Sequence, residues 1–265
     1  MKAKVFGIIS VKGGVGKTTS TSNLGLILSK VFNKKVCIVD ANFSAPNLGL
    51  HFGIINPKFS IQDVLSNKAD IKNVIHQFEN MDLILSNPKN SSINPQKFKS
   101  KINSLRNKYD VILIDSSPSL NNEMLSTIIA SDELIVMSSP DYPTLYSTLH
   151  AIKVAGSKNM PILGLVLNNV YHEKFELSIN DIENISGINV ISKIPHTKLI
   201  PKSISESNPV TNIFPNSDVA VEYAKLASVM IKEDYKDNRL ISKVKRLLSN
   251  NDPLDKTREI IRTRL

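Results

Sequence analysis

Short apolar runs, rich in β-branched residues, alternate along the chain with longer segments whose apolar side chains recur at helical spacing. The short runs are continuously apolar, which is typical of strands buried on both faces of a mostly parallel sheet. Strands are predicted at residues 5–9, 36–39, 83–85, 111–114, 134–137, 163–167 and 190–194. Helices are predicted between them, at residues 18–31, 95–107, 121–130, 144–155 and 218–231.

This alternation predicts an α/β fold with a doubly wound, mostly parallel sheet flanked by helices. The chain has 265 residues, of which 41% are hydrophobic, so it can bury a substantial core. Residues 1–232 are predicted to form the α/β domain, in which residues 42–82 are less regular and carry loops and short helices. Residues 233–265 are predicted to form a basic C-terminal tail.

Charge and cysteine content narrow the class of protein. The formal net charge of +9 favours polyanionic surfaces such as nucleic acid or acidic lipid. The single cysteine, Cys37, lies in an apolar run and can form neither an internal disulfide nor a cysteine-rich metal site within one chain. The first ten residues fit a strand rather than a signal peptide, and no apolar run approaches the roughly 20 residues that span a bilayer. We therefore expect a cytoplasmic protein, at most peripheral to a membrane or associated with the nucleoid.

A glycine-rich loop lies between the first predicted strand and the first predicted helix, where residues 11–19 read VKGGVGKTT. Glycines let the backbone turn its N–H groups toward a phosphate, and the following helix N-terminus favours negative charge. Lys17 is expected to reach the β and γ phosphates and the Thr18 hydroxyl to bind magnesium. The loop therefore predicts binding of ATP with Mg²⁺, through Gly13, Gly14, Val15, Gly16, Lys17, Thr18 and Thr19.

The loop has Val11 where glycine is usual, and it carries an additional lysine, Lys12. This form resembles the deviant phosphate loop of the MinD/ParA family of ATPases, closer to the MinD branch. The resemblance implies a P-loop NTPase fold, ATP hydrolysis, and a homodimer that forms when ATP is bound. It also implies that Lys12 reaches the nucleotide of the partner subunit, and that a protein activator and a cargo exist.

Two later segments extend the resemblance. Residues 109–118, YDVILIDSSP, look like the magnesium-side strand of the family, which implies that Asp115 and the strand-end Asp40 hold Mg²⁺. Residues 164–169, GLVLNN, look like the strand whose asparagine binds adenine. The implied adenine contacts are Asn168, whose amide offers both a donor and an acceptor, and Pro195.

The segment after Asp40 corresponds to the first switch of the family. It departs from the family pattern at Asn42, where a second aspartate is usual. An amide can orient water but is not a useful general base. Because phosphoryl transfer depends mostly on positioning and charge stabilisation, we expect hydrolysis to be slow rather than absent.

The tail leaves the target surface open. From residue 239 to 265 it carries eight Lys/Arg and three acids, 8 − 3 = +5, and residues 239–248 fit a basic amphipathic helix. Such a helix suits acidic lipid, as in MinD-like positioning ATPases, but it could also pack on the domain. Residues 253–265 could instead contact DNA or form a dimer. A ParA-like ATPase that binds DNA without sequence preference is the alternative, and a small-molecule ligase also stays open.

Overall fold

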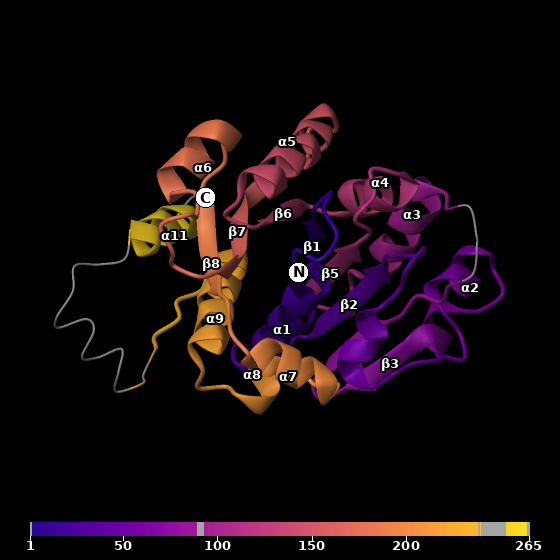
Figure 1. Cartoon of the computed structure of the whole chain (residues 1–265). Coiled ribbons are helices and arrows are strands. Elements are labelled where there is room, and N and C mark those ends of the chain that lie inside the picture. Colours follow the sequence, from indigo (N-terminus) through magenta and orange to yellow (C-terminus); the bar gives the residue numbers. More distant parts are fainter. Residues whose placement is uncertain (1, 89–92, 238, 240–252, 264–265) are drawn as a thin grey trace.

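The computed structural model describes residues 2–88, 93–237, 239 and 253–263. A sheet of eight strands runs through the molecule in the order β3-β4-β2-β5-β1-β6-β7-β8 (Figure 1). All neighbouring strands are parallel except β3 and β4. The strands are β1 (Lys4–Ile9), β2 (Val36–Ala41), β3 (Ile75–Phe78), β4 (Met81–Ile84), β5 (Val111–Ser116), β6 (Glu133–Ser138), β7 (Ile162–Val170) and β8 (Val190–Pro195).

Helices cover both faces of the sheet because successive strand residues point to opposite sides. Phe6 belongs to the apolar cluster that includes Leu24 and Tyr223, whereas its neighbour Val5 packs in the cluster of Phe98. The helices are α1 (Lys17–Lys30), α2 (Ile61–Leu65), α3 (Pro95–Leu105), α4 (Asn122–Ala130), α5 (Tyr142–Ser157), α6 (Ile179–Ser186), α7 (Leu199–Ser205), α8 (Val210–Ile213), α9 (Asp218–Ile231) and α11 (Pro253–Thr263), with 3-10 helices η1 (Leu48–Phe52) and η2 (Ile71–Val74). Among the helices so described, none is long and apolar enough to cross a bilayer.

The doubly wound sheet predicted from the sequence is confirmed, and the predicted strands all lie in it with shifts of a few residues at their ends. One strand was not predicted. The edge strand β3 has only four residues, each partly or fully exposed, and pairs antiparallel with β4. Its short half-exposed sequence carries little periodicity, so its pairing with β4 rather than its own pattern determines the strand.

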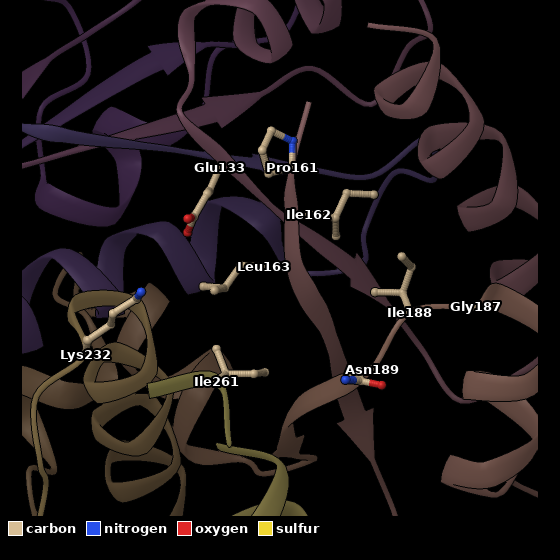
Figure 2. Close-up of a pocket in the computed structure, with 9 residues that line it drawn as sticks. All are labelled: Glu133, Pro161, Ile162, Leu163, Gly187, Ile188, Asn189, Lys232 and Ile261. Carbon is tan, nitrogen blue, oxygen red and sulfur yellow. The ribbon is translucent and has the colours of Figure 1, made fainter. Parts of the chain in front are cut away.

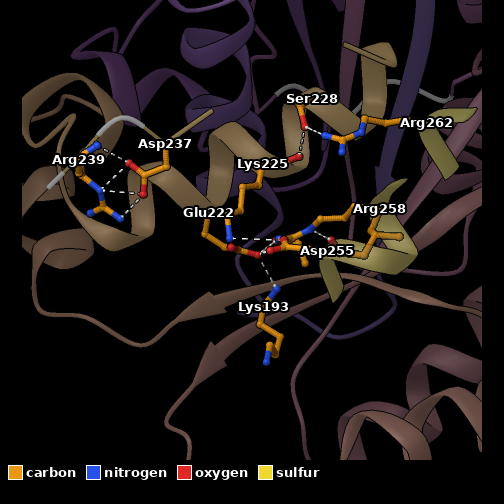
Figure 3. A network of polar contacts seen from close by, with 11 residues as sticks. Lys193, Glu222, Lys225, Ser228, Asp237, Arg239, Asp255, Arg258 and Arg262 are labelled. Atoms are coloured by element: carbon orange, nitrogen blue, oxygen red, sulfur yellow. Dashed lines mark hydrogen bonds and ion pairs between the residues drawn. The ribbon is translucent and has the colours of Figure 1, made fainter. Parts of the chain in front are cut away.

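The last described helix, α11, lies against the edge strand β8 and against α9 (Figure 3). Arg258 is 2% exposed, donates from Nε to the carbonyl of Ile191 at 2.8 Å, and pairs with Glu222 and Asp255. The Arg258 side chain thus satisfies a backbone carbonyl of the edge strand β8. Without it, this carbonyl would be open to pairing with a strand of another chain. Of the predicted amphipathic helix at 239–248, residues 240–248 lie outside the described part of the chain.

A cavity of about 350 Å³ lies beside α11, at the amino ends of β6, β7 and β8 (Figure 2). Apolar side chains that include Ile162, Ile188 and Ile261 line it together with Glu133 and Lys232. The phosphate loop follows the carboxyl end of β1, so this cavity is at the other end of the parallel strands, and none of the predicted site residues lines it.

Candidate functional site

The phosphate loop joins the carboxyl end of β1 to the first turn of α1. Gly14 and Gly16 have φ values of 76° and 91°, in the left-handed region that favours glycine. A Cβ atom at Gly16 would meet Nδ2 of Asn168, so a side chain there would displace the Asn168 amide as well as strain the backbone. The loop therefore leaves backbone N–H groups and the N-terminus of α1 available to an anion.

Lys17 stands at the first position of α1 and is buried, with 7% of its surface exposed. Its Nζ donates to the carbonyl of Lys12 at 3.3 Å across the loop. Burial lowers the pKa of Lys17, and the nearby charge of Asp115 opposes that shift. A cation held this close to the loop backbone is placed to meet the phosphates of a nucleotide.

Asp40 and Asp115 are register partners at the carboxyl ends of β2 and β5, and both are buried. Burial, followed by the neighbouring charge of Asp115, raises the pKa of Asp40 well above its usual range. Burial raises the pKa of Asp115 to about 6, although the Thr18 hydrogen bond and the Lys17 charge oppose the shift. Two buried carboxylates side by side are unfavourable without a cation between or beside them.

The Thr18 hydroxyl donates to Oδ2 of Asp115 at 2.6 Å, and its oxygen also lies 3.0 Å from Oδ1 of Asn47. Carboxylate and hydroxyl oxygens are the ligands that Mg²⁺ prefers, and it is bound beside phosphates through few protein ligands. The donor set therefore fits this ion, which Thr18, Asp40 and Asp115 would hold directly or through water. When bound, Mg²⁺ would neutralise charge that develops on the phosphates.

Asn42 lies two residues after Asp40 and is 7% exposed. Its backbone N–H donates to Oδ1 of Asp40 at 2.9 Å, and its Nδ2 donates to the carbonyl of Ala45 at 2.6 Å. Within the described ranges of the chain, its Oδ1 is buried with no hydrogen-bond partner. A buried acceptor left open in this way can take a hydrogen bond from a water molecule.

Sequence reasoning missed Glu123, which lies in the first turn of α4 and is 8% exposed. Its carboxylate accepts hydrogen bonds from the loop that carries Asn42, at Phe43 and Ser44. Its charge is also one of the weaker causes of the raised pKa of Asp40. An acid in a predicted first helical turn was the available signal, but such residues are common and do not reveal a distant partner.

Lys12 differs from Lys17 in both exposure and direction. Its side chain is 45% exposed, and its Nζ donates to Oγ1 of Thr144 at 2.5 Å and lies 3.8 Å from Oδ1 of Asp141. Asp141 caps the N-terminus of α5, so Lys12 rests on the helix that follows β6. An exposed ion pair of this kind contributes about 0–1 kcal/mol, so Lys12 can leave it at little cost.

Asn168 is near the end of β7, and its Nδ2 donates to the carbonyl of Val15 at 2.9 Å. In the part of the chain that is described, its Oδ1 is buried and unpartnered. Pro195 ends β8 and is the register partner of Val170. Beyond it, the rings of Tyr171 and His196 stack with centroids 4.2 Å apart.

The structure thus brings four residues together at the carboxyl ends of the central strands, with Asn42 beside them. They are Lys17, Thr18, Asp40 and Asp115. Asn168 reaches the same loop from β7, whereas Pro195 lies one strand further out. Thr19 is half-buried in the first turn of α1, and Val15 is buried under the loop. The roles of these residues toward a nucleotide remain predictions.

Comparison with known proteins gives consistent matches over most of the chain. A family model described as an AAA domain matches residues 3–160. An uncharacterized ATP-binding protein of Methanocaldococcus jannaschii is 30% identical over 89% of this chain and 90% of its own length. A virulence plasmid ParA family protein of Chlamydia psittaci is 30% identical over 90% of this chain and 98% of its own length.

The solved structures include a match to the fold. The septum site-determining protein MinD of Pyrococcus horikoshii, complexed with Mg-ADP, is 28% identical and has a TM-score of 0.78. The match covers 86% of this chain and 96% of that protein.

Proposed function

Because this chain belongs to the MinD/ParA family of P-loop ATPases, and hydrolyses ATP with Mg²⁺ as they do, we propose that it works as an ATP-dependent dimerising switch. ATP binding closes two copies of the chain into a homodimer, and hydrolysis releases them. The dimer binds an extended surface in the cell and positions a division site or a cargo on it. A protein activator stimulates hydrolysis and so resets the switch.

The orientation of Lys12 is the observation that carries this proposal. Lys17 is buried inside its own loop, whereas the Lys12 side chain is 45% exposed and its Nζ contacts the buried hydroxyl of Thr144 and the exposed carboxylate of Asp141. A cation in this position is available to the phosphates of a second subunit. Because such a contact requires a bound triphosphate, it makes association depend on ATP.

Exposed apolar side chains around the same edge of the sheet support a contact surface there. Leu120 follows β5, Tyr142 and Tyr146 lie in the first turns of α5 after β6, and Tyr171 and Phe175 follow β7. Each of these side chains is at least half exposed. Large apolar groups gathered at one edge are typical of an interaction site, and this edge is the one that carries the phosphate loop.

The individual roles follow from the geometry as proposals. Lys17 binds the β and γ phosphates, and Thr18, Asp40 and Asp115 hold Mg²⁺. Asn168 and Pro195 border the adenine, since Asn168 offers an open buried acceptor beside the loop. Residues 1–232 form the ATPase domain, and residues 233–265 contribute the surface-binding segment.

Asn42 makes hydrolysis slow in this proposal. Its open Oδ1 can orient the attacking water but cannot take its proton. Asn42→Asp is expected to raise kcat by about tenfold. A positioned general base can supply roughly 10²–10⁴-fold, but the gain here should be smaller because phosphoryl transfer depends largely on positioning. Phosphate release at saturating ATP measures the effect. Equal turnover of the two proteins would contradict this role of Asn42.

The surface that the dimer binds is proposed to be acidic membrane, through the amphipathic sequence at 239–248. Its apolar residues recur on one side of a helix and its basic residues surround them, as expected for a helix lying in a lipid headgroup layer. Non-specific DNA is the second candidate, which the net charge of +9 favours.

Leu247→Glu is expected to reduce sedimentation of the ATP-loaded protein with vesicles of acidic lipid by about tenfold or more, because a buried leucine contributes about 1.5–3 kcal/mol. Ser242→Glu is the matched control, since it adds the same charge on the polar side of the predicted helix. ATP binding should be unchanged in both variants. The native protein and the two variants could instead all bind vesicles equally weakly. If all three also bind DNA with an affinity that falls steeply as salt is raised, DNA is the surface instead.

A further inference from the structure

Glu123 binds the loop that follows β2, although it belongs to the helix that follows β5. One carboxylate oxygen, Oε2, accepts from the N–H of Phe43 at 3.1 Å and from the N–H of Ser44 at 3.4 Å. The other oxygen, Oε1, accepts a short hydrogen bond from the Ser44 hydroxyl. Three donors of one loop thus converge on a single side chain.

The Glu123 carboxylate is nearly buried, and its charge is not balanced by a salt bridge to any residue that the structure describes. Glu123 is 8% exposed, and across the described ranges no Lys or Arg forms an ion pair with it. Its charge is instead balanced by the loop N–H groups and by the N-terminus of α4, in whose first turn it lies. It also lies close enough to Asp40 for the two charges to repel. A third acid near two buried acids is unfavourable, so its hydrogen bonds to the loop must compensate for it.

The clamped residues come directly after Asn42. The peptide N–H of Phe43 is held by Glu123, and the Phe43 ring is buried against Phe98 with centroids 5.8 Å apart. These two attachments fix the chain on one side of Asn42, while Asp40 holds its N–H on the other side. Glu123 therefore holds the backbone next to Asn42, whose side-chain amide in turn donates to the carbonyl of Ala45 in the same loop.

We propose that Glu123 is a positioning residue for hydrolysis, which joins the Asn42 loop to α4 so that the loops after β2 and β5 move as one unit. It holds the open acceptor of Asn42 toward the nucleotide without touching the nucleotide itself. This inference rests on the proposed role of Asn42. It adds a residue outside the motifs that identify the family and assigns it a mechanical role.

Glu123→Gln tests this role because glutamine keeps the shape but offers one acceptor oxygen and no charge. We expect kcat to fall by roughly tenfold to a hundredfold with KM for ATP changed less than about threefold, as for a misplaced reacting group. Hydrogen exchange at the Phe43 and Ser44 amides should become faster. Glu133→Gln is the matched control, since Glu133 pairs with Lys4 at 2.8 Å in another part of the sheet. It should change neither kcat nor the exchange rates of the Phe43 and Ser44 amides.

Ser44→Ala gives a second and milder test, since Ser44 is exposed and its loss cannot unfold the protein. It should lower kcat in the same direction, and its effect should shrink in the Glu123→Gln background because both variants break one contact. Faster amide exchange with unchanged kcat, or additive effects of the two substitutions, would overturn the inference. The molar mass of the native protein with ATP, measured in the same series, reports separately on the proposed dimer.

Discussion

Replacing Lys17 with alanine is expected to lower ATP turnover by roughly a hundredfold or more, the scale seen when one preorganised charge-stabilising group is removed. Lys17 is buried against the phosphate loop, with its Nζ 3.3 Å from the carbonyl of Lys12, and it lies near the buried carboxylate of Asp115. Its loss leaves the phosphate charge uncompensated inside the loop. Phosphate release with saturating ATP and Mg²⁺ measures the effect, together with the affinity for labelled nucleotide.

Lys30→Ala is the matched control for this experiment. Lys30 ends the same helix, where its Nζ lies 3.2 Å from the carboxylate of Glu79 and far from the loop. Its replacement should leave turnover within about twofold of the native value, since exposed ion pairs contribute about 0–1 kcal/mol. A Lys17→Ala protein that hydrolyses ATP within a few-fold of the native rate would show that nucleotide is not hydrolysed at this loop.

Lys12→Ala is expected to abolish ATP-dependent dimerisation while leaving nucleotide binding by the monomer within about threefold of the native value. The reason is that the Lys12 side chain is 45% exposed and its Nζ contacts Thr144 and Asp141 at the start of α5. Truncating a charged group that pairs with a buried opposite charge across an interface costs about 2–5 kcal/mol, which corresponds to a loss of roughly thirtyfold or more. Light scattering with ATP and with ADP gives the dimer fraction.

Lys34→Ala serves as the control, since Lys34 is another partly exposed lysine, paired with Glu233 at 2.5 Å and placed after the far end of α1. It should dimerise like the native protein. Mixing Lys12→Ala with Lys17→Ala adds a sharper test. If Lys12 acts on the partner's nucleotide, a mixed dimer contains one complete site, and the mixture should hydrolyse ATP faster than the two proteins do separately. A Lys12→Ala protein that dimerises normally would contradict the proposed role.

The sheet and the phosphate loop could be predicted from the sequence because their signals are local. A strand buried on both faces must be continuously apolar, and a loop that wraps a phosphate must contain glycines where φ is positive, as at Gly14 and Gly16. The adjacency of Asp40 and Asp115 could also be anticipated, since the carboxyl ends of parallel strands meet at one edge.

Features that depend on distant contacts could not be predicted. β3 is defined by its pairing with β4, and α11 by the insertion of Arg258 between β8 and α9. The role of Glu123 depends on a loop 79–80 positions earlier in the chain. Such contacts arise from tertiary packing and leave no periodic trace in the sequence.

The structure also clarifies Asn42, which departs from the family pattern. In place of a base, it provides a buried acceptor on a loop whose backbone is held by Asp40 on one side and by Glu123 on the other. This arrangement suits a switch that resets slowly, because it can orient water without activating it. We therefore expect the proposed ATP dimer to persist long enough to be measured with ATP itself.

The molar mass of the native protein in solution tests the ATP-dependent dimer most directly. With ADP and Mg²⁺, light scattering should give the mass of one chain, 29.4 kDa. With ATP and Mg²⁺ it should give twice that mass, and the value should return to that of one chain as the ATP is consumed. The same mass with both nucleotides, whether of one chain or of two, would contradict the proposal that ATP closes the dimer.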